Sequence, residues 1–487
     1  MKDLRSLLNT GSIKTSSRRI DLAVDAIDLA EVLAGEDHFA FLDTSSAGGQ
    51  QGRFSILAWE PNLIFRSKGN HIDIRVNGTW RQQKGNPLDA LDDILRACTS
   101  DSVLPESLPF AGGAVGYFGY DLFSLIERYE LLHAVDDLGL PDCYLTFFDS
   151  ALIYDHHEEQ WHIAGSSVFR ETENLDELFD RRIEKVKQLQ NLAAEPKHEK
   201  RNKPEDVQGD FIESNFTIEE YVAAVRKTIE HIYAGDIYQL NLSQRFHTVI
   251  NASPFALFKT LRRINPSYYG AFLKYDGHVV VSSSPELFLK RNGKVVETRP
   301  IKGTRPRGND DLEDERLKGE LCVSPKESAE LSMIVDLERN DLGRVCRYGS
   351  VVVDEHRYVE TLPTVFHTIS TVRGELSDGV GTVDLLRATF PGGSITGCPK
   401  IRSIQIIDQL EPTCRNVYTG SIGYVGFNGD LILNIAIRTL IVKGRDVYFQ
   451  VGGGIVADSN PLAEFTETLH KAAAIMQALK AVEQGDE

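Results

Sequence analysis

The sequence predicts an α+β fold in which large antiparallel sheets carry the core. β-type runs dominate residues 1–190, and further β runs lie among several helices in residues 211–487. The helices do not alternate regularly with the strands, which disfavours a doubly wound parallel sheet. With 487 residues, 41% hydrophobic and 25% charged, the chain can bury a large core.

Residues 1–190 form a strand-rich N-terminal region. Strands are expected at residues 39–42, 71–76 and 144–153, where β-prone runs are separated by turn residues. A charged helix is expected at residues 175–192. Residues 191–210 predict a linker, because Glu, Lys, Asn, Pro and Gln dominate them and apolar residues are few.

Residues 211–487 form a second region of mixed structure. Ile218, Val222, Val225, Ile229 and Ile232 recur at helical spacing, which predicts a helix over residues 218–234. β runs predict strands at residues 279–283, 351–353, 431–442 and 446–451.

Charge and cysteine usage exclude several classes of protein. The net charge of −18 argues against a nucleic-acid partner, which needs a basic surface. No run of 18 or more apolar residues occurs, so neither a membrane span nor secretion is expected. Six scattered cysteines without a C-x-x-C pair fit a reducing compartment, and a cytoplasmic location is expected.

Two segments combine helix signals with carboxylates. Ser324, Pro325 and Glu327 predict a helix start, with a serine N-cap and a glutamate that closes a capping box. Glu330 lies on the same face as Glu327. On spacing alone, Glu327 is more often a cap than a ligand.

The second such helix is expected to begin near Pro461. Its apolar stripe would comprise Leu462, Phe465, Leu469, Ala472 and Met476. Glu464, Glu467 and Lys471 share one polar face, which spacing alone assigns to solvent with a Glu467–Lys471 pair. The alternative is that both helices direct carboxylates at one Mg²⁺, an ion that prefers hard oxygen ligands.

Three loops carry signals for anion binding or nucleophilic chemistry. In the basic loop 300–308, Lys302 lies between Ile301 and a glycine, and partial desolvation there would lower its pKa. Residues 391–397 precede an expected helix at 399–410, whose exposed N–H groups suit a carboxylate. The glycine run 452–454 follows a strand and permits close approach to a ligand. Each loop taken alone is more often a plain turn.

Seven segments together carry a family resemblance. They are residues 238–246, 283–286, 300–308, 335–341, 391–400, 437–439 and 452–471. In this order they resemble the chorismate-utilising enzymes over residues 216–479, with a weaker resemblance at residues 112–117 and 120–121. The resemblance implies sheets packed as a sandwich with surrounding helices and a central site that binds chorismate in residues 211–487.

The resemblance also implies roles for individual residues. The metal ligands would be Glu330 and Glu467, with Glu327 and Glu464 nearby, and the metal would be Mg²⁺. The anionic parts of chorismate would be held by Arg438, Ser394 and the backbone of Gly452, Gly453 and Gly454, with Lys471 close by. Lys302 would be the nucleophile, Glu286 the general acid and His367 an active-site histidine, although a structural histidine is the alternative for the last.

Two positions favour one branch of this family. The water-using members carry a lysine at the position of Gln239, and a glutamine cannot deprotonate water. The anthranilate-forming members typically carry alanine at the position of Lys302, whereas the aminodeoxychorismate-forming members typically carry lysine. We therefore expect C4 amination of chorismate, which would feed p-aminobenzoate and folate synthesis. Anthranilate formation is the alternative, and a non-catalytic chorismate-binding protein is a remote one.

Two further expectations concern effectors and partners. Residues 1–190 resemble the family's tryptophan-binding region at Arg53, but residues 42–45 depart from its pattern, so only Ser45 and Arg53 stay as effector-like residues. A purely structural role for this region is the alternative. No Cys–His–Glu glutaminase arrangement is visible, so ammonia is expected from a separate glutamine amidotransferase subunit.

Overall fold

The computed structural model describes most of the chain. It covers residues 8, 13–45, 52–76, 78–99, 108–129, 132–169, 174–194, 212–362 and 365–485. The first four residues of the expected linker 191–210 complete helix α5 (Leu175–Ala194), and the rest of it lies outside the described residues.

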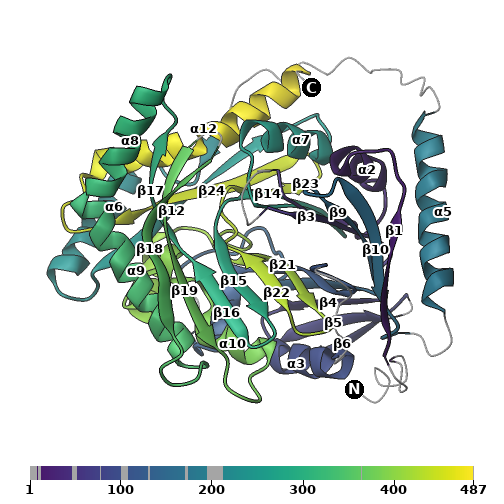
Figure 1. Ribbon diagram of the computed structural model, residues 1–487. Helices are drawn as coiled ribbons and strands as arrows, with labels where there is room; N and C mark the ends of the chain where they lie inside the picture. The colour runs from purple at the N-terminus through teal and green to yellow at the C-terminus, as the bar shows by residue number, and fades with distance from the viewer. Residues whose placement is uncertain are drawn as a thin grey trace.

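Two large antiparallel sheets form the molecule, which confirms the predicted fold class (Figure 1). Across the first sheet the strands are β1 (Thr15–Ile20), β10 (Gln160–Ser166), β9 (Ser150–Asp155), β3 (Phe54–Ala58), β2 (Ala40–Asp43), β13 (Tyr269–Tyr275), β14 (His278–Ser284), β23 (Thr439–Lys443), β24 (Asp446–Ile455), β12 (Gln239–Val249) and β11 (Glu213–Ser214), with β20 (Gly397–Cys398) on β12. Across the second they are β17 (Ile301–Pro306), β19 (Val365–Glu375), β16 (Val295–Arg299), β15 (Leu287–Asn292), β22 (Leu431–Asn434), β21 (Ser421–Gly426), β7 (Gly113–Phe118), β8 (Cys143–Phe148), β4 (Leu63–Lys68), β5 (His71–Val76) and β6 (Thr79–Lys84), with β18 (Val352–Thr361) on β19.

Strands from the two sequence regions share both sheets. In the first sheet β2 pairs with β13, where Phe41 lies opposite Phe272. In the second sheet β7 pairs with β21, where Gly116 lies opposite Gly423. The boundary between residues 1–190 and 211–487 therefore runs through two continuous sheets.

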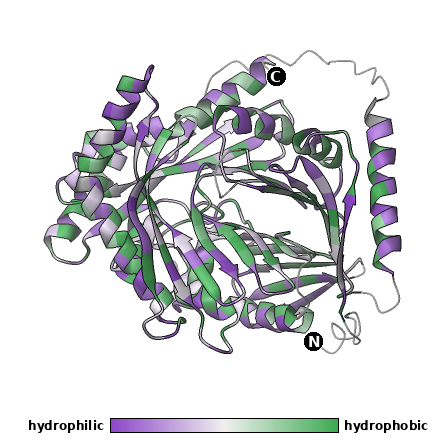
Figure 2. Cartoon of the chain, viewed as in Figure 1, coloured by the Kyte–Doolittle hydropathy of each residue, from purple (hydrophilic) through white to green (hydrophobic). Residues whose placement is uncertain are grey.

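Three apolar layers hold the sandwich together. Between the sheets, aromatic and aliphatic side chains interdigitate, and the Tyr144 and Tyr275 rings stack at 4.1 Å between centroids. The outer face of the first sheet packs against α2 (Ala26–Leu33), α5, α7 (Pro254–Ile264) and α12 (Pro461–Gln484). The outer face of the second packs against α3 (Pro87–Cys98), α9 (Pro325–Gly343) and α10 (Thr382–Thr389). Figure 2 shows hydrophobic residues gathered along the strands and polar ones along the outer side of α5.

The remaining helices lie near β12 and β17. Helices α6 (Ile218–Tyr233) and α11 (Lys400–Leu410) pack with β12 in a smaller apolar cluster, and α8 (Asp311–Val323) packs beside β17 and β19. Helix α6 confirms the helix predicted for residues 218–234, with Thr217 and Glu220 forming a capping box. No helix in the described part of the chain has both the length and the apolar character to cross a membrane.

Several predicted strands differ in detail. The run 144–153 is two strands, β8 and β9, because the chain turns at Asp149. The run 431–442 is also two strands, and the break between β22 and β23 contains Arg438 in a left-handed conformation at φ 49°. The segment around Lys302, predicted as a loop, is strand β17, and the glycines 452–454 lie within β24 rather than after it. Hydrophobic periodicity alone does not detect strands that contain several glycines or charged residues.

Candidate active site

Lys302 lies on β17 and points its amine at a turn from a distant part of the chain. Its Nζ donates a hydrogen bond of 2.8 Å to the backbone oxygen of Ser394, in the 3₁₀ turn η2 (Gly393–Ile395). Burial lowers the pKa of the Lys302 amine, while the carboxylates of Glu286 and Glu330 oppose that shift. A lysine that is oriented by one hydrogen bond, partly buried and lowered in pKa can act as a nucleophile.

Glu286 joins β14 to β15 and faces the same interior. Its side chain is only 5% exposed, and burial raises the pKa of its carboxyl group, with the charge of Lys302 acting against the rise. A raised pKa favours the protonated form of the carboxyl group, which is the form that a general acid needs.

His367 lies on β19 beside the Lys302 strand. Its Nδ1 shares a hydrogen bond of 2.8 Å with the hydroxyl of Thr304, and its Nε2 is buried without a hydrogen-bond partner among the described residues. Burial, with the charge of Arg438, lowers the pKa of His367 to about 3, so the imidazole is neutral. Most buried polar atoms are hydrogen-bonded, so this nitrogen is a candidate for contact with a ligand, and a structural role stays the alternative.

Arg438 presents a positive charge without a carboxylate partner in the described part of the chain. Its Nη1 donates to Asn265 Oδ1 at 2.8 Å, and burial lowers the pKa of its guanidinium. Asn265 is itself fixed by a 3.0 Å bond to Ser283 Oγ. Such a positioned and uncompensated cation is suited to an anionic substrate group. Asn265 was not predicted from the sequence, since its role depends on a side-chain contact between the end of α7 and the segment before β23.

Gln239 and the glycines 452–454 of strand β24 lie side by side near the candidate site. Gln239 starts β12, is buried, and has an Oε1 without a hydrogen-bond partner among the described residues. A Cβ atom added at Gly454 would overlap Gln239 Nε2, and one added at Gly452 would lie 2.6 Å from Asn241 Oδ1. A side chain at Gly452 or Gly454 would therefore displace one of these two amides.

We expect Gly454→Ala to displace the Gln239 amide and lower kcat/KM for chorismate about 100-fold, as small displacements in a site do. Steady-state kinetics with chorismate measures the effect, and the thermal unfolding midpoint should change little because Gln239 ends in a rotatable amide. Gly319→Ala, on α8 with nothing within 4 Å of the added Cβ, is the matched control. Equal kinetics for both variants would contradict the proposed role of the Gln239 amide in binding chorismate.

Helix α9 begins as predicted but does not form the complete capping box. Ser324 Oγ accepts a hydrogen bond of 3.4 Å from the backbone N–H of Glu327. The Glu327 side chain does not close the box, because its Oε1 accepts a hydrogen bond of 2.8 Å from Arg305 Nη1. Glu327 Oε2 is buried and has no hydrogen-bond partner among the described residues. Glu330 lies on the next turn of the same helix, within electrostatic reach of Lys302.

The predicted apolar stripe of helix α12 is wrong at its first residue, Leu462. Leu462 is 60% exposed, while Glu464 and Thr468 are buried, because Ser459 Oγ donates to Glu464 Oε1 at 2.6 Å and Gln244 Nε2 donates to Thr468. Phe465, Leu469 and Met476 pack partly buried against the apolar clusters, and Ala472 is fully buried.

The polar face of α12 meets the glycine strand. Lys471 Nζ lies 2.8 Å from Glu467 Oε1 and donates 3.0 Å to the oxygen of Gly452. A Cβ atom at Gly453 would lie 3.5 Å from Glu464 Oε2 and 3.8 Å from Glu467 Oε1. The predicted Glu467–Lys471 pair is thus present, and it faces the strand that carries the site.

The carboxylates of α9 and α12 are the candidates for a magnesium site with few protein ligands. No group of three or more His, Cys, Asp or Glu side chains is arranged to hold a metal by itself in the part of the chain that is described. Magnesium, however, usually takes one or two protein carboxylates and completes its shell with substrate oxygens and water. Glu330 on α9 and Lys471 on α12, which pairs with Glu467, both act electrostatically on Lys302, so the two helices approach the same amine.

A buried ion pair, which the sequence did not reveal, connects the Ser394 turn to strand β12. Arg415 bonds Glu411 through Nε and Nη2, at 2.8 and 2.7 Å, and also donates to Ile395 O at 3.0 Å and Asn241 O at 2.7 Å. It therefore fixes the Ser394 turn relative to strand β12. An arginine and a glutamate four residues apart predict only a helical pair, so no local signal could have indicated this role.

The effector-like residues are held by the protein itself. Ser45 Oγ donates to Ser267 O at 3.2 Å and accepts the Ser267 N–H at 2.9 Å. Arg53 Nε and Nη2 make a forked pair with Asp155, at 3.0 and 2.6 Å to Oδ2. Both residues have structural roles, and a role in effector binding stays a prediction.

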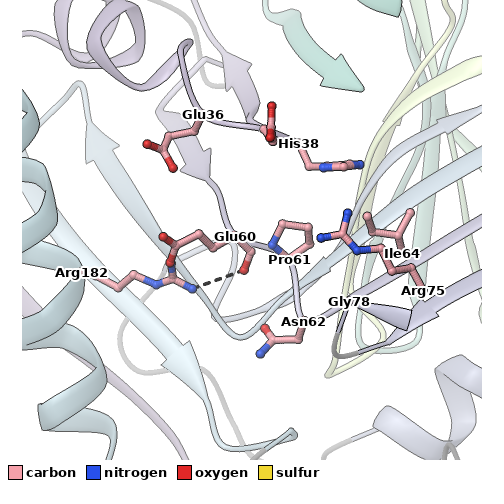
Figure 3. A pocket seen from close by; sticks show the side chains of 10 residues that line it. Glu36, His38, Glu60, Pro61, Asn62, Ile64, Arg75, Gly78 and Arg182 are labelled. Atoms are coloured by element: carbon pink, nitrogen blue, oxygen red, sulfur yellow. Dashed lines mark hydrogen bonds and ion pairs between the residues drawn. The ribbon is translucent and has the colours of Figure 1, made fainter. Parts of the chain in front are cut away.

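A polar cavity of about 460 Å³ lies among N-terminal elements, and no predicted site residue lines it (Figure 3). Arg182 pairs there with Glu60, and Lys185 pairs with Glu36 and Glu60. Because these charges neutralise one another, this cavity does not offer the convergent catalytic groups found around Lys302.

Lys302 and Glu286 thus form one electrostatically linked pair and His367 and Arg438 form a second, with Lys302 and His367 on the paired strands β17 and β19. The chain belongs to the chorismate binding enzyme family, whose sequence pattern matches residues 40–477. It is 40% identical to aminodeoxychorismate synthase component 1 of Bacillus subtilis (strain 168) over 437 residues, covering 89% of this chain and 90% of that protein. It is 38% identical to anthranilate synthase component 1 of Acetivibrio thermocellus over 460 residues, covering 91% of each.

A solved structure gives the same result for the fold. The crystal structure of anthranilate synthase component I from Streptococcus pneumoniae TIGR4 superposes with a TM-score of 0.72 at 32% identity, covering 88% of this chain and 93% of that one. The sandwich predicted from the family resemblance is therefore confirmed.

Proposed function

We propose that this chain is the chorismate-aminating component of an aminodeoxychorismate synthase, which converts chorismate and ammonia to 4-amino-4-deoxychorismate for p-aminobenzoate and folate synthesis. The observation that carries the proposal is Lys302, whose amine is oriented at 2.8 Å by Ser394 O beside the buried carboxyl of Glu286. A nucleophile and a general acid side by side can carry out a displacement in two steps, through a covalent intermediate.

In the proposed reaction Lys302 attacks ring carbon C2 with its lone pair. The two ring double bonds shift, the C4–O bond breaks, and Glu286 gives its proton to the hydroxyl, which leaves as water. Ammonia then attacks C4, the double bonds shift back and the C2–N bond breaks, so that Lys302 leaves as a neutral amine. Glu286 recovers its proton from the new C4 ammonium group.

The other residues bind and orient the substrate. Arg438, with the Gly452–Gly454 backbone and Ser394, would hold anionic groups of chorismate, and Gln239 and His367 would contact its polar groups. Bound Mg²⁺, held by Glu330 and Glu467 with Glu327 and Glu464 nearby, would neutralise one chorismate carboxylate. All six cysteines are free, which supports a cytoplasmic location.

Anthranilate synthesis is the second candidate, because relatives of both kinds have similar identities of 40% and 38%. The two reactions differ in the carbon that receives nitrogen and in the loss of pyruvate, so the product separates them. Simple binding of chorismate without turnover, the remote alternative, would leave its absorbance spectrum unchanged over time.

We expect the purified chain, given chorismate, ammonium and Mg²⁺, to accumulate a product with the mass of 4-amino-4-deoxychorismate. Mass spectrometry identifies it, and the absence of anthranilate fluorescence provides an independent readout. Anthranilate as the main product would replace this proposal with the second candidate.

The ammonia source has its own control. We expect the chain alone to use ammonium but not glutamine, because the proposed nitrogen donor in the cell is a glutamine amidotransferase subunit. Glutamine-dependent turnover by the chain alone would refute the need for that partner.

A further inference from the structure

Glu338 is a buried carboxyl group that the reaction as described does not use. It lies on α9 and is only 7% exposed. Its Oε2 accepts a hydrogen bond of 3.1 Å from Thr298 Oγ1 on β16. A carboxyl group this far from solvent, with one neutral donor, is costly to keep as an isolated anion.

Strand register places Thr298, the hydrogen-bond partner of Glu338, on the strand paired with the segment that follows Glu286. Leu287, directly after Glu286, lies opposite Arg299, and Thr298 is the neighbour of Arg299 on β16. The Thr298 hydroxyl that reaches Glu338 therefore belongs to the strand paired with the Glu286 segment. From the same helix, Leu337 packs under Gly393 in the turn that orients Lys302.

The charges around Glu338 come from four elements. Glu286 from the β14–β15 junction and Asp341 from α9 are negative, while Lys400 from α11 and Lys302 from β17 are positive. Asp341 and Lys400 already form a buried ion pair, and Lys400 also donates 2.9 Å to Thr389 O. The unbalanced members are therefore two carboxyls, Glu286 and Glu338, and one amine, Lys302.

We propose that Glu338 is a positioning residue that forms with Glu286 a buried carboxyl pair, which holds a single proton for transfer to the leaving C4 hydroxyl. This inference rests on the proposed function. Two carboxyls in one dry site resist ionising together, so the charge on one keeps the proton on the other. Burial, with the charge of Glu286, accordingly raises the pKa of Glu338.

The pair also fits the charge changes of the reaction. When the proton leaves, the pair becomes more negative by one charge. At the same moment the nitrogen of Lys302 becomes positive by one charge as it bonds to C2. The two changes offset each other inside one cluster, which limits the electrostatic cost of the step.

The test is the pH profile of Glu338→Gln, which keeps an acceptor for Thr298 and removes the charge. Loss of a neighbouring anion lowers the pKa of Glu286 and of Lys302 alike, so both limbs of the kcat/KM profile for chorismate should move to lower pH by about one unit. The profile is measured at a fixed concentration of un-ionised ammonia. A purely structural role would lower the whole curve without moving its limbs, and unmoved limbs would overturn the proposal.

Two variants control this experiment. Glu338→Asp keeps the charge and should keep the limbs in place at reduced height. Asp336→Asn, on the same helix with a side chain 73% exposed, should match the parent protein. Limbs that move equally in Asp336→Asn would also overturn the proposal.

A second measurement needs no turnover. In Glu286→Gln, the infrared carbonyl band of the protonated Glu338 carboxyl should disappear at a lower pH than in the parent, because its like-charged partner is gone. An unchanged titration would overturn the pairing. The identity of the product tests the proposed function separately, since the limbs can be followed by chorismate consumption whichever amine is formed.

Discussion

Lys302→Ala should abolish formation of 4-amino-4-deoxychorismate, with a loss of at least about 1,000-fold in kcat, the scale seen when a covalent nucleophile is removed. Without the amine there is no enzyme-bound intermediate to direct ammonia to C4. Ammonia can then attack C2 directly in the space that Lys302 occupied, so the residual product should carry nitrogen at C2. Mass spectrometry and product fluorescence separate the two amines.

Lys294→Ala is the matched control for that variant. Lys294 lies in the turn between β15 and β16, its side chain is 55% exposed, and it pairs with Asp378. Its loss should leave turnover unchanged, because exposed ion pairs contribute little. Undiminished C4 amination by Lys302→Ala would refute covalent catalysis, even if the enzyme proved to be an aminodeoxychorismate synthase.

Glu330→Gln and Glu467→Gln should each lower kcat/KM for chorismate at least about 100-fold and weaken divalent-ion binding, since each removes one of only two principal carboxylate ligands. Excess Mg²⁺ should restore part of the activity, and chelation should inactivate the parent protein. Binding of Mn²⁺, followed by its paramagnetic resonance in the presence of chorismate, provides a readout that does not depend on turnover.

Glu315→Gln, an exposed glutamate on α8, is the control for the metal variants. It carries the same loss of charge without facing Lys302. Mn²⁺ binding that survives both Glu330→Gln and Glu467→Gln would show that the ion is held elsewhere.

The sequence was informative where function requires particular residues at short spacing. The motifs around Lys302, Glu286 and Gly452–Gly454 identified the family, and all three lie at one site in the structure. Strand β5 and helix α6 were also recognised, because alternation and helical periodicity are local signals.

What the sequence could not reveal depends on contacts between distant segments. Asn265 holds Arg438 from 173 residues away, and Thr298 meets Glu338 over 40 residues. Neither residue type is unusual in its local context. The apolar stripe of α12 was wrong at Leu462 because the buried neighbours of its first turns are polar, which composition does not reveal.

The pairing of β2 with β13 and of β7 with β21 joins the two sequence regions into one structural unit. If the chain were cut between residues 194 and 212, each fragment would have unpaired edge strands in both sheets. Such edges promote aggregation. Neither half contains a complete sheet, and both sheets need strands from the second half of the chain before they are complete. Maturation should accordingly be slow, as it is for topologies dominated by long-range pairing.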